Sequence, residues 1–212
     1  MQRSRVLIAD DHTLVAEMCK KLLEPEFEVC GIVDDGRALV KAAISLRPDV
    51  IIADIAMPNL NGLDAAQQIR AAARSIKIIF LTMNSRVDVA AEAFRRGASA
   101  YLLKTCACSE IVTAVRESLR GKRYLSPSIP RSAFDLLLRQ EKTLEGDQHL
   151  TERQREVLQL LAEGKVMKEV GGILNLSTRT VAFHKYRIME VLGAKSSADL
   201  VKYAIRNHIV AA

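Results

Sequence analysis

No apolar stretch of this sequence reaches 18 uninterrupted residues, so no segment is long and apolar enough to cross a membrane as a helix. The N-terminal stretch MQRSRVLIAD has only four consecutive apolar residues before Asp10, which is too short for the hydrophobic part of a secretory signal. We therefore expect a cytoplasmic protein that makes no membrane contact. Apolar residues still make up 49% of the chain, which is ample for packed cores.

Cysteine is also scarce. The four cysteines are Cys19, Cys30, Cys106 and Cys108, and only the last two are close together, as C-x-C. Neither a second cysteine pair nor a histidine cluster completes the spacing of a zinc site. We interpret the four as scattered reduced thiols of a cytosolic protein.

The net charge of +6 is spread unevenly over the 212 residues. Residues 1–122 hold 17 basic and 15 acidic side chains, and residues 123–148 hold four of each. Residues 149–212 hold ten basic and six acidic side chains. The length allows two domains, and the small basic C-terminal part favours a surface for nucleic acid.

Residues 1–122 alternate between short apolar runs and stretches with helical spacing. One such stretch places Val87, Ala90, Ala91 and Phe94 on one helical face. Five strands, each followed by a helix, predict an α/β domain with a parallel sheet covered on both faces. The expected strands are Val6–Ala9, Phe27–Val33, Val50–Ala53, Ile78–Leu81 and Ala100–Leu103.

Polar side chains follow these strands, and the carboxyl ends of parallel strands meet at one edge of a sheet. The expected set is Asp10, Asp11, Asp54, Thr82 and Lys104. Three carboxylates in one crevice repel one another, and Mg²⁺ offsets that repulsion with the oxygen ligands it prefers. The set holds no thiol or imidazole ligand, which argues against zinc.

The stretch VIIADIAMPNLNG suggests what Asp54 does there. A buried strand ends at this carboxylate, and the Pro and Asn-Gly that follow are turn residues. A carboxylate beside Mg²⁺ attacks phosphorus in some phosphoryl-transfer proteins, while Lys104 and Thr82 supply a charge and a hydroxyl for phosphoryl oxygens. We interpret Asp54 as a phosphate acceptor. The alternatives are solvated strand-end carboxylates without such a role, or a site that no longer accepts phosphate.

Residues 1–122 resemble the receiver domain of two-component response regulators. The resemblance rests on D10-D11, D54 with M57-P58 and N61-G62, T82, and K104. It implies a flavodoxin-like, five-stranded parallel sheet of order 2-1-3-4-5 and phosphorylation of Asp54 by a sensor histidine kinase. It further implies an Mg²⁺ ion bound by Asp11, Asp54 and the Ala56 carbonyl with help from Asp10, and a switch formed by Thr82 and Tyr101. The alternative for Tyr101 is a half-buried tyrosine of the strand.

One residue departs from the receiver pattern. Thr105 follows Lys104 where the family commonly has proline, and that Lys–Pro peptide is often cis. A cis peptide before threonine costs far more than one before proline. We expect a trans bond here, or a strained one.

Residues 123–148 interrupt the alternation, and we interpret them as a linker with one short helix around Ala133–Leu138. Residues 149–212 have no strand signal and predict a small all-α domain of four helices. Thr151 caps the first helix, Ser177 caps a third over about Thr178–Leu192, and Gly193 closes it. Two short helices joined by a tight turn predict a helix-turn-helix.

The third helix has two faces. Val181 and Ile188 belong to an inward apolar stripe that has His184 at its edge. We expect His184 to contact a phosphate or to have its hydrogen bonds made within the domain, rather than to bind a metal. Phe183 and Tyr186 face outward, as they would in a DNA major groove. The alternative is that they pack on the first domain or a second copy. The full set of expected DNA-contacting residues is Ser177, Arg179, Thr180, Ala182, Phe183, His184, Lys185, Tyr186 and Arg187.

Residues 149–212 resemble the output domain of the LuxR/NarL/FixJ type. The matching residues include L150-T151-E152-R153-Q154-R155-E156-V157-L158, G164, K168-E169-V170, L174, S177, T180-V181, H184, I188 and L192-G193. Ala182 replaces a usual lysine, and Gly171-Gly172 replaces residues that favour helix. Relatives dimerise through the fourth helix, where we expect Val201 and Ala204 to be available, so the resemblance implies a homodimer on double-stranded DNA.

Together the two parts predict a transcription factor, not an enzyme, in which phosphate on Asp54 releases the DNA-contacting helix from the first domain. Two other interpretations stay open. One is a DNA-binding regulator that works without phosphorylation. The other is a Mg²⁺-dependent phosphatase or phosphotransferase for a small molecule.

Overall fold

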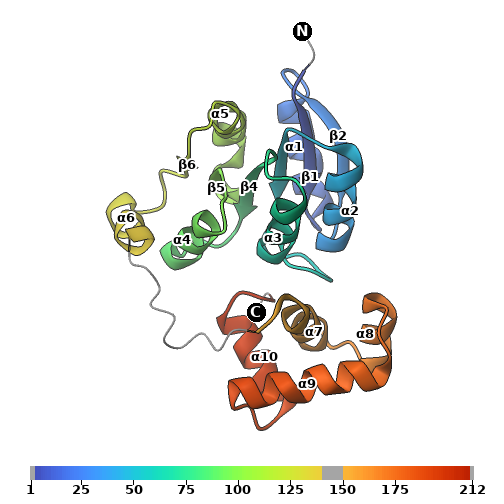
Figure 1. Ribbon diagram of the computed structural model, residues 1–212. Helices are drawn as coiled ribbons and strands as arrows, with labels where there is room; N and C mark the ends of the chain where they lie inside the picture. The colour runs from blue at the N-terminus through green and yellow to red at the C-terminus, as the bar shows by residue number, and fades with distance from the viewer. Residues whose placement is uncertain (1–2, 140–149, 211–212) are drawn as a thin grey trace.

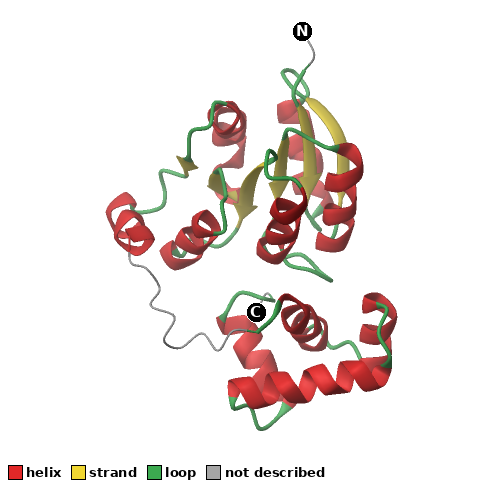
Figure 2. Ribbon diagram, viewed as in Figure 1, coloured by secondary structure: helices red, strands yellow, loops and turns green. Residues whose placement is uncertain are grey.

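The computed structural model describes residues 3–139 and 150–210. Its first domain is built on a parallel sheet with the strand order β2-β1-β3-β4-β5-β6 (Figures 1 and 2). All five predicted strands are present, and a short sixth strand extends the sheet from the segment for which we expected a linker. The strands are β1 (Arg5–Ala9), β2 (Glu28–Val33), β3 (Val50–Ala53), β4 (Lys77–Thr82), β5 (Ala100–Leu103) and β6 (Tyr124–Leu125).

Helices cover both faces of the sheet because successive strand side chains point to opposite sides. In β3, Ile51 and Ala53 join the core beneath α2 (Gly36–Leu46), α3 (Gly62–Ala72) and α4 (Val87–Arg95). Val50 and Ile52 join the core beneath α1 (Thr13–Leu23) and α5 (Ala107–Leu119), which follows a 3-10 turn at Lys104–Cys106. Strands β1, β3, β4 and β5 are thus buried on both sides, whereas the edge strand β2 is partly exposed.

The predicted linker helix is present as α6 (Arg131–Arg139), and it packs on α4. The rings of Phe134 and Phe94 meet edge to face with their centroids 5.1 Å apart. Ile129, just before α6, is buried in the same core. The first part of the expected linker therefore packs against the sheet domain, and its remainder, residues 140–149, lies outside the described residues.

The second domain consists of α7 (Glu152–Ala162), α8 (Met167–Leu174), α9 (Thr178–Leu192) and α10 (Ser197–Arg206) around one small core. These are the four predicted helices. The Thr151 hydroxyl accepts from the Gln154 N–H and the Gln154 side chain accepts from the Thr151 N–H, as the capping box predicts. Ser177 caps α9, and Gly193 ends it with φ +63°.

Gly171 has a packing reason that the sequence did not show. A Cβ at this position of α8 would lie 2.7 Å from the Leu176 carbonyl oxygen, too close for any side chain. The Gly171 carbonyl in turn accepts a 2.8 Å hydrogen bond from the Leu176 N–H. The glycine therefore lets the turn fold tightly onto α8, which sets the angle of α9. Nothing in the structure explains Gly172.

The two domains meet through α7, which lies beside α3, while α9 lies on the side of its domain away from the sheet (Figure 1). Within the described part of the chain, no helix has the length and apolar character needed to cross a membrane.

The α6 contact predicts a stability difference between two neighbouring positions. Phe134→Ala removes a ring that is 4% exposed, and we expect it to lower the free energy of unfolding of the sheet domain by about 3 kcal/mol. Leu136→Ala on the same helix is the control, because Leu136 is 60% exposed and its loss should change the value by less than about 0.5 kcal/mol. Urea unfolding measures both, and equal effects would show that α6 is not docked on α4 in solution.

Candidate functional site

The ends of β1, β3 and β4 bring the predicted acidic crevice together. Asp10 and Asp54 are each 4% exposed, and Thr82 is 3% exposed, whereas Asp11 stands at the exposed rim. The Asp54 N–H donates to the Ala9 carbonyl over 2.8 Å, so the pairing of β1 with β3 sets the position of the Asp54 backbone. Parallel pairing alone is what gathers these side chains, which are far apart in the chain.

Lys104 joins the crevice from the end of β5. Its Nζ lies 2.7 Å from Asp54 Oδ2 and 2.8 Å from Asp10 Oδ2, with only 7% of the side chain exposed. Burial on its own lowers the pKa of this ammonium group, but its hydrogen bonds to Asp10 and Asp54 and their charges outweigh burial and raise it. Lys104 is therefore charged, and it offsets the repulsion between the two buried carboxylates.

His12 also belongs to this cluster, which corrects our statement that the set holds no imidazole. Ligand atoms of Asp10, Asp11, His12 and Asp54 all lie within 4.8 Å of one another. His12 Nδ1 is 2.9 Å from Asp11 Oδ1, and 65% of its side chain is exposed. The sequence signal was the position of His12 directly after Asp10-Asp11. The buried donors remain carboxylate oxygens, a set that fits Mg²⁺.

The loop after Asp54 is tightly packed against the site. Asp54 Oδ1 accepts from the Ile55 N–H over 2.6 Å, and Ala56 is exposed at the crevice. A Cβ at Gly62 would lie 2.0 Å from the Asp54 carbonyl oxygen. The first residue of α3 must therefore be glycine, so that this helix can begin directly against the end of β3.

Thr82 and Tyr101 are linked by a residue that sequence reasoning missed. The Thr82 hydroxyl accepts from the Asn84 N–H over 3.2 Å, and the Tyr101 hydroxyl donates to the Asn84 carbonyl over 2.8 Å. Tyr101 is completely buried, not half-buried, and burial raises its pKa, with the charges of Asp54 and Asp88 acting in the same direction. Asn84 therefore couples the strand-end hydroxyl to the buried ring.

The Lys104–Thr105 peptide is trans, as expected, since the described chain contains no cis peptide bond. The 3-10 turn at Lys104–Cys106 takes up the position of the commonly found Lys–Pro turn.

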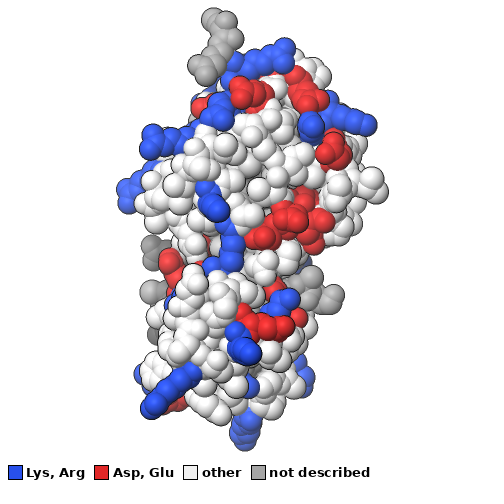
Figure 3. Space-filling model, turned by 90° about the vertical axis from the view of Figure 1, so that its right-hand side faces the viewer, with Lys and Arg blue, Asp and Glu red and all other residues white. Residues whose placement is uncertain are grey.

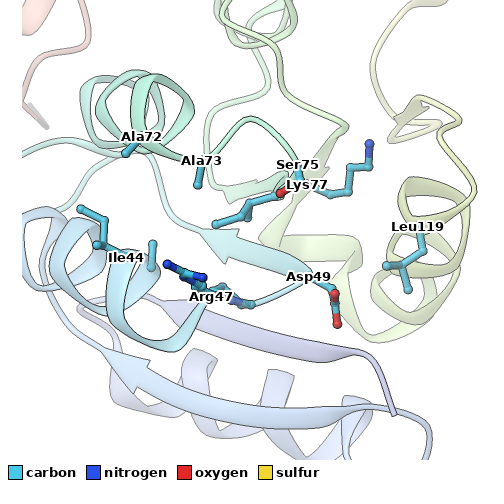
Figure 4. Close-up of a pocket in the computed structure, with 11 residues that line it drawn as sticks. Ile44, Arg47, Asp49, Ala72, Ala73, Ser75, Lys77 and Leu119 are labelled. Atoms are coloured by element: carbon cyan, nitrogen blue, oxygen red, sulfur yellow. The ribbon is translucent and has the colours of Figure 1, made fainter. Parts of the chain in front are cut away.

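A pocket of about 480 Å³ lies elsewhere, at the opposite end of the sheet (Figure 4). Asp49 and Lys77, which line it, stand at the amino ends of β3 and β4. The Asp49 carboxylate already accepts from the Arg5 N–H over 2.7 Å. The pocket is therefore separate from the acidic crevice, which is formed at the carboxyl ends of the same strands.

The outward face of α9 is free of the first domain. Phe183 is 66% exposed and Tyr186 is 68% exposed, while Val181 and Ile188 are fully buried in the core. This arrangement confirms the predicted facing of the helix. It contradicts the alternative in which Phe183 and Tyr186 pack on the first domain. Control of the DNA-contacting helix by phosphate on Asp54 stays a prediction.

The remaining predicted DNA-contacting residues gather on α9 and its N-terminus. Ser177, Arg179 and Arg187 are exposed, whereas Thr180, Ala182, His184 and Lys185 are half-buried. Arg187 pairs with Glu190 one turn on, at 2.5 Å. On the face seen in Figure 3, acidic and basic side chains are interspersed over both domains, and basic ones project from the lower end of the second domain.

Two family models match the chain. Residues 6–116 match the response regulator receiver domain, and residues 148–204 match the bacterial regulatory proteins of the luxR family. The chain is a response regulator. Its receiver and luxR-type domains form the architecture of a phosphorylation-controlled transcription factor that binds DNA, as both resemblances implied.

Relatives match over nearly their whole length. The transcriptional regulatory protein LiaR of Bacillus subtilis is 35% identical over 208 residues, which cover 97% of this chain and 99% of LiaR. The response regulator UvrY of Escherichia coli K12 is 31% identical, with 95% and 94% covered. A solved structure of Salmonella typhimurium RcsB has a TM-score of 0.61 at 28% identity, with 96% and 97% covered. A structure of two RcsB dimers bound to two parallel DNAs has a TM-score of 0.57 at 28% identity, with 95% and 98% covered.

Asp64, on α3 of the receiver, is the centre of a buried ion cluster between the domains. Its carboxylate lies 2.8 Å from Arg96 Nη1 of the receiver and 2.9 Å from Arg155 Nε of α7. Burial raises the pKa of Asp64, but the charges of Arg155 and Arg96 and the hydrogen bonds from Arg155 and Asn61 outweigh burial and lower it. No pattern in the sequence predicts this contact, because Asp64 and Arg155 lie in different domains.

Replacing Asp64 by asparagine would leave two mostly buried guanidinium groups short of a counter-charge. We expect Asp64→Asn to lower the free energy of unfolding by about 2 kcal/mol at pH 7. A lowered pKa gives stability that is present above the ordinary value of 3.8 and is lost only as the pH falls below it. The difference in the free energy of unfolding between Asp64→Asn and wild type, measured with denaturant, should therefore stay the same from pH 7 to about pH 5.

The control is Asp88→Asn, which breaks an exposed pair with Arg86. This change should cost less than about 1 kcal/mol. A difference for Asp64→Asn that disappeared between pH 7 and pH 5 would contradict the ion cluster.

Proposed function

We propose that Asp54 is the residue that accepts phosphate, and that the donor is a phosphohistidine on a sensor histidine kinase. The observation that carries this proposal is the placement of Lys104 between Asp54 and Asp10 at the ends of their strands. A fixed ammonium at that point neutralises charge on an incoming phosphoryl group as well as on the two carboxylates. The receiver family of the chain supports the same role for Asp54.

The transfer needs few protein groups. An oxygen of the Asp54 carboxylate attacks phosphorus, the phosphorus–nitrogen bond breaks, and its electron pair stays on the histidine nitrogen of the donor. Lys104 and the Thr82 hydroxyl are placed to bind phosphoryl oxygens. Asp10, Asp11, Asp54 and the Ala56 carbonyl would hold Mg²⁺, which supplies further positive charge for the phosphoryl oxygens when bound.

We further propose that α9 is the helix that reads DNA. Its exposed aromatic pair and Arg179 suit a major groove, where apolar groups contact thymine methyls and arginine binds guanine. The Ser177 end of the helix is placed to bind phosphate through its N–H groups. The solved RcsB–DNA structures support this assignment through family membership, and we infer a cytoplasmic location, where such a regulator meets DNA.

A homodimer on DNA is part of the proposal, as in the RcsB dimers bound to DNA. Of the two α10 residues expected at the contact, Ala204 is fully buried in the core of its own domain, so it is not available. Val201 is half-buried and lines an open pocket of about 270 Å³ together with the exposed Val166. The family consists of DNA-binding regulators, and we propose no turnover of a small-molecule substrate.

Phosphate acceptance is tested by intact-mass spectrometry after incubation with Mg²⁺ and acetyl phosphate. We expect one added phosphoryl mass on the wild type, none on Asp54→Ala, and the wild-type result on Asp88→Ala, an exposed carboxylate outside the crevice. Chelation of Mg²⁺ should abolish the added mass. A phosphoryl group retained by Asp54→Ala would assign acceptance to another residue.

DNA reading is tested by measuring the affinity of the phosphorylated protein for its operator as a function of salt. Arg179→Ala should weaken specific binding by about tenfold, which corresponds to the loss of one base contact. Lys202→Ala, a change of an exposed cation on α10, is the control and should leave specific binding within about twofold. Equal losses in the two variants would mean that α9 is not the reading helix.

A further inference from the structure

The cavity at the amino ends of β3 and β4, called the basal cavity below, has the size of a small-molecule site. Its volume is about 480 Å³, and pockets for small molecules usually span about 300 to 1,000 Å³. Its walls come from the ends of α2 and α3, from the segments that lead into β3 and β4, and from α5 (Figure 4). All the residues that line it belong to the receiver, and none of them takes part in the acidic crevice.

Much of the basal cavity is apolar. Ala72 and Ala73, at the end of α3, present only methyl groups, and the side chain of Ile76 is buried beside them. Ile44, on the last turn of α2, also lines the cavity and is 53% exposed, which is unusual for an isoleucine. An apolar group bound here would remove this surface from water, which favours binding.

Arg47, which ends α2, has a strained backbone and a side chain without a partner. Its φ of +47° and ψ of +60° lie in the left-handed region, which glycine adopts at helix ends without steric cost. Its guanidinium group makes no hydrogen bond or ion pair in the part of the chain that the structure describes. The fold would therefore be served better by glycine at this position. Strain of this kind, carried by a side chain that lines a cavity, points to a function for that side chain.

The charged groups around the basal cavity leave an excess of positive charge. The Lys77 ammonium group, like the Arg47 guanidinium, has no partner among the described residues. The one lining carboxylate, Asp49, already accepts the Arg5 N–H over 2.7 Å through Oδ2. Ser75 adds a hydroxyl that can donate a hydrogen bond. Two unpaired cations and a hydroxyl suit a negatively charged group.

From these features we infer that the basal cavity binds an organic anion with an apolar body. Its carboxylate or phosphate group pairs with Arg47, and its body covers Ile44 and Ile76. A neutral apolar molecule would leave Arg47 unpaired, and an inorganic anion would leave Ile44 in water. Because the site belongs to the folded receiver, occupancy stabilises that domain. The inference does not depend on the proposed role of Asp54.

The test uses three probes on the full-length protein, with binding followed by isothermal titration calorimetry. The probes are 2-naphthoate, its neutral counterpart of the same shape 2-naphthamide, and acetate. We expect 2-naphthoate to bind at one site, and the other two to bind at least about tenfold more weakly, because each lacks the charge or the apolar body. Equal binding of 2-naphthoate and 2-naphthamide would overturn the inference, as would no binding of 2-naphthoate at millimolar concentration.

The decisive variant is Arg47→Gly, because it removes the guanidinium and relieves the backbone at once. We expect it to bind 2-naphthoate at least about tenfold more weakly than wild type, with an unfolding midpoint equal to or above that of wild type. Wild-type affinity in Arg47→Gly would place the ligand elsewhere and overturn the inference.

The control is Arg74→Ala. Arg74 is an exposed cation of the loop after α3, and it does not line the basal cavity. Its affinity for 2-naphthoate should stay within about twofold of wild type. An equal loss of affinity in Arg74→Ala and Arg47→Gly would reveal general attraction to positive charge and would also overturn the inference.

Discussion

The site depends on two buried carboxylates that share one ammonium group. Asp10 and Asp54 would repel each other if they were charged and unpaired in this crevice, and Lys104 removes that cost by binding both. The arrangement requires β1, β3 and β5 to end at one edge of the sheet. The parallel topology provides that edge, and the burial of Asp10, Asp54 and Lys104 there strengthens the attraction between their charges.

The loop after Asp54 connects this chemistry with the second domain. Gly62 allows α3 to begin against the Asp54 carbonyl, and Asn61 and Asp64 at the start of that helix bond to α7. The receiver thus holds the DNA-binding domain by α7, while α9 stays exposed on the far side. The contact with the receiver and the proposed DNA contact use different faces of one small helical domain, and the shared core of α7, α9 and α10 joins them.

Residues that depart from the family pattern have local explanations. Thr105 is accommodated by a trans peptide and a 3-10 turn, and Gly171 by its close approach to the Leu176 carbonyl. His12 adds an imidazole to the acidic cluster without entering the buried part of the crevice. These changes leave the crevice and the helix-turn-helix intact.

The sequence by itself determined the elements and the chemistry of the crevice. Apolar runs of four to seven residues placed the first five strands, and capping residues placed α7 and α9. Strand-end polar residues predicted that Asp10, Asp54, Thr82 and Lys104 would meet. These features follow from local propensity and from the rule that parallel strands end together. What only the tertiary structure decided is which surfaces of the two domains touch. Contacts between residues about a hundred positions apart define these surfaces, namely the bonds of Gln159 to Met57 and Asn61 and the Asp64–Arg155 pair. The exposure of Phe183 depends on the same arrangement of the two domains. The residue pattern within one domain does not predict these contacts between domains, because polar side chains on one surface form their hydrogen bonds only when the other folded surface is present.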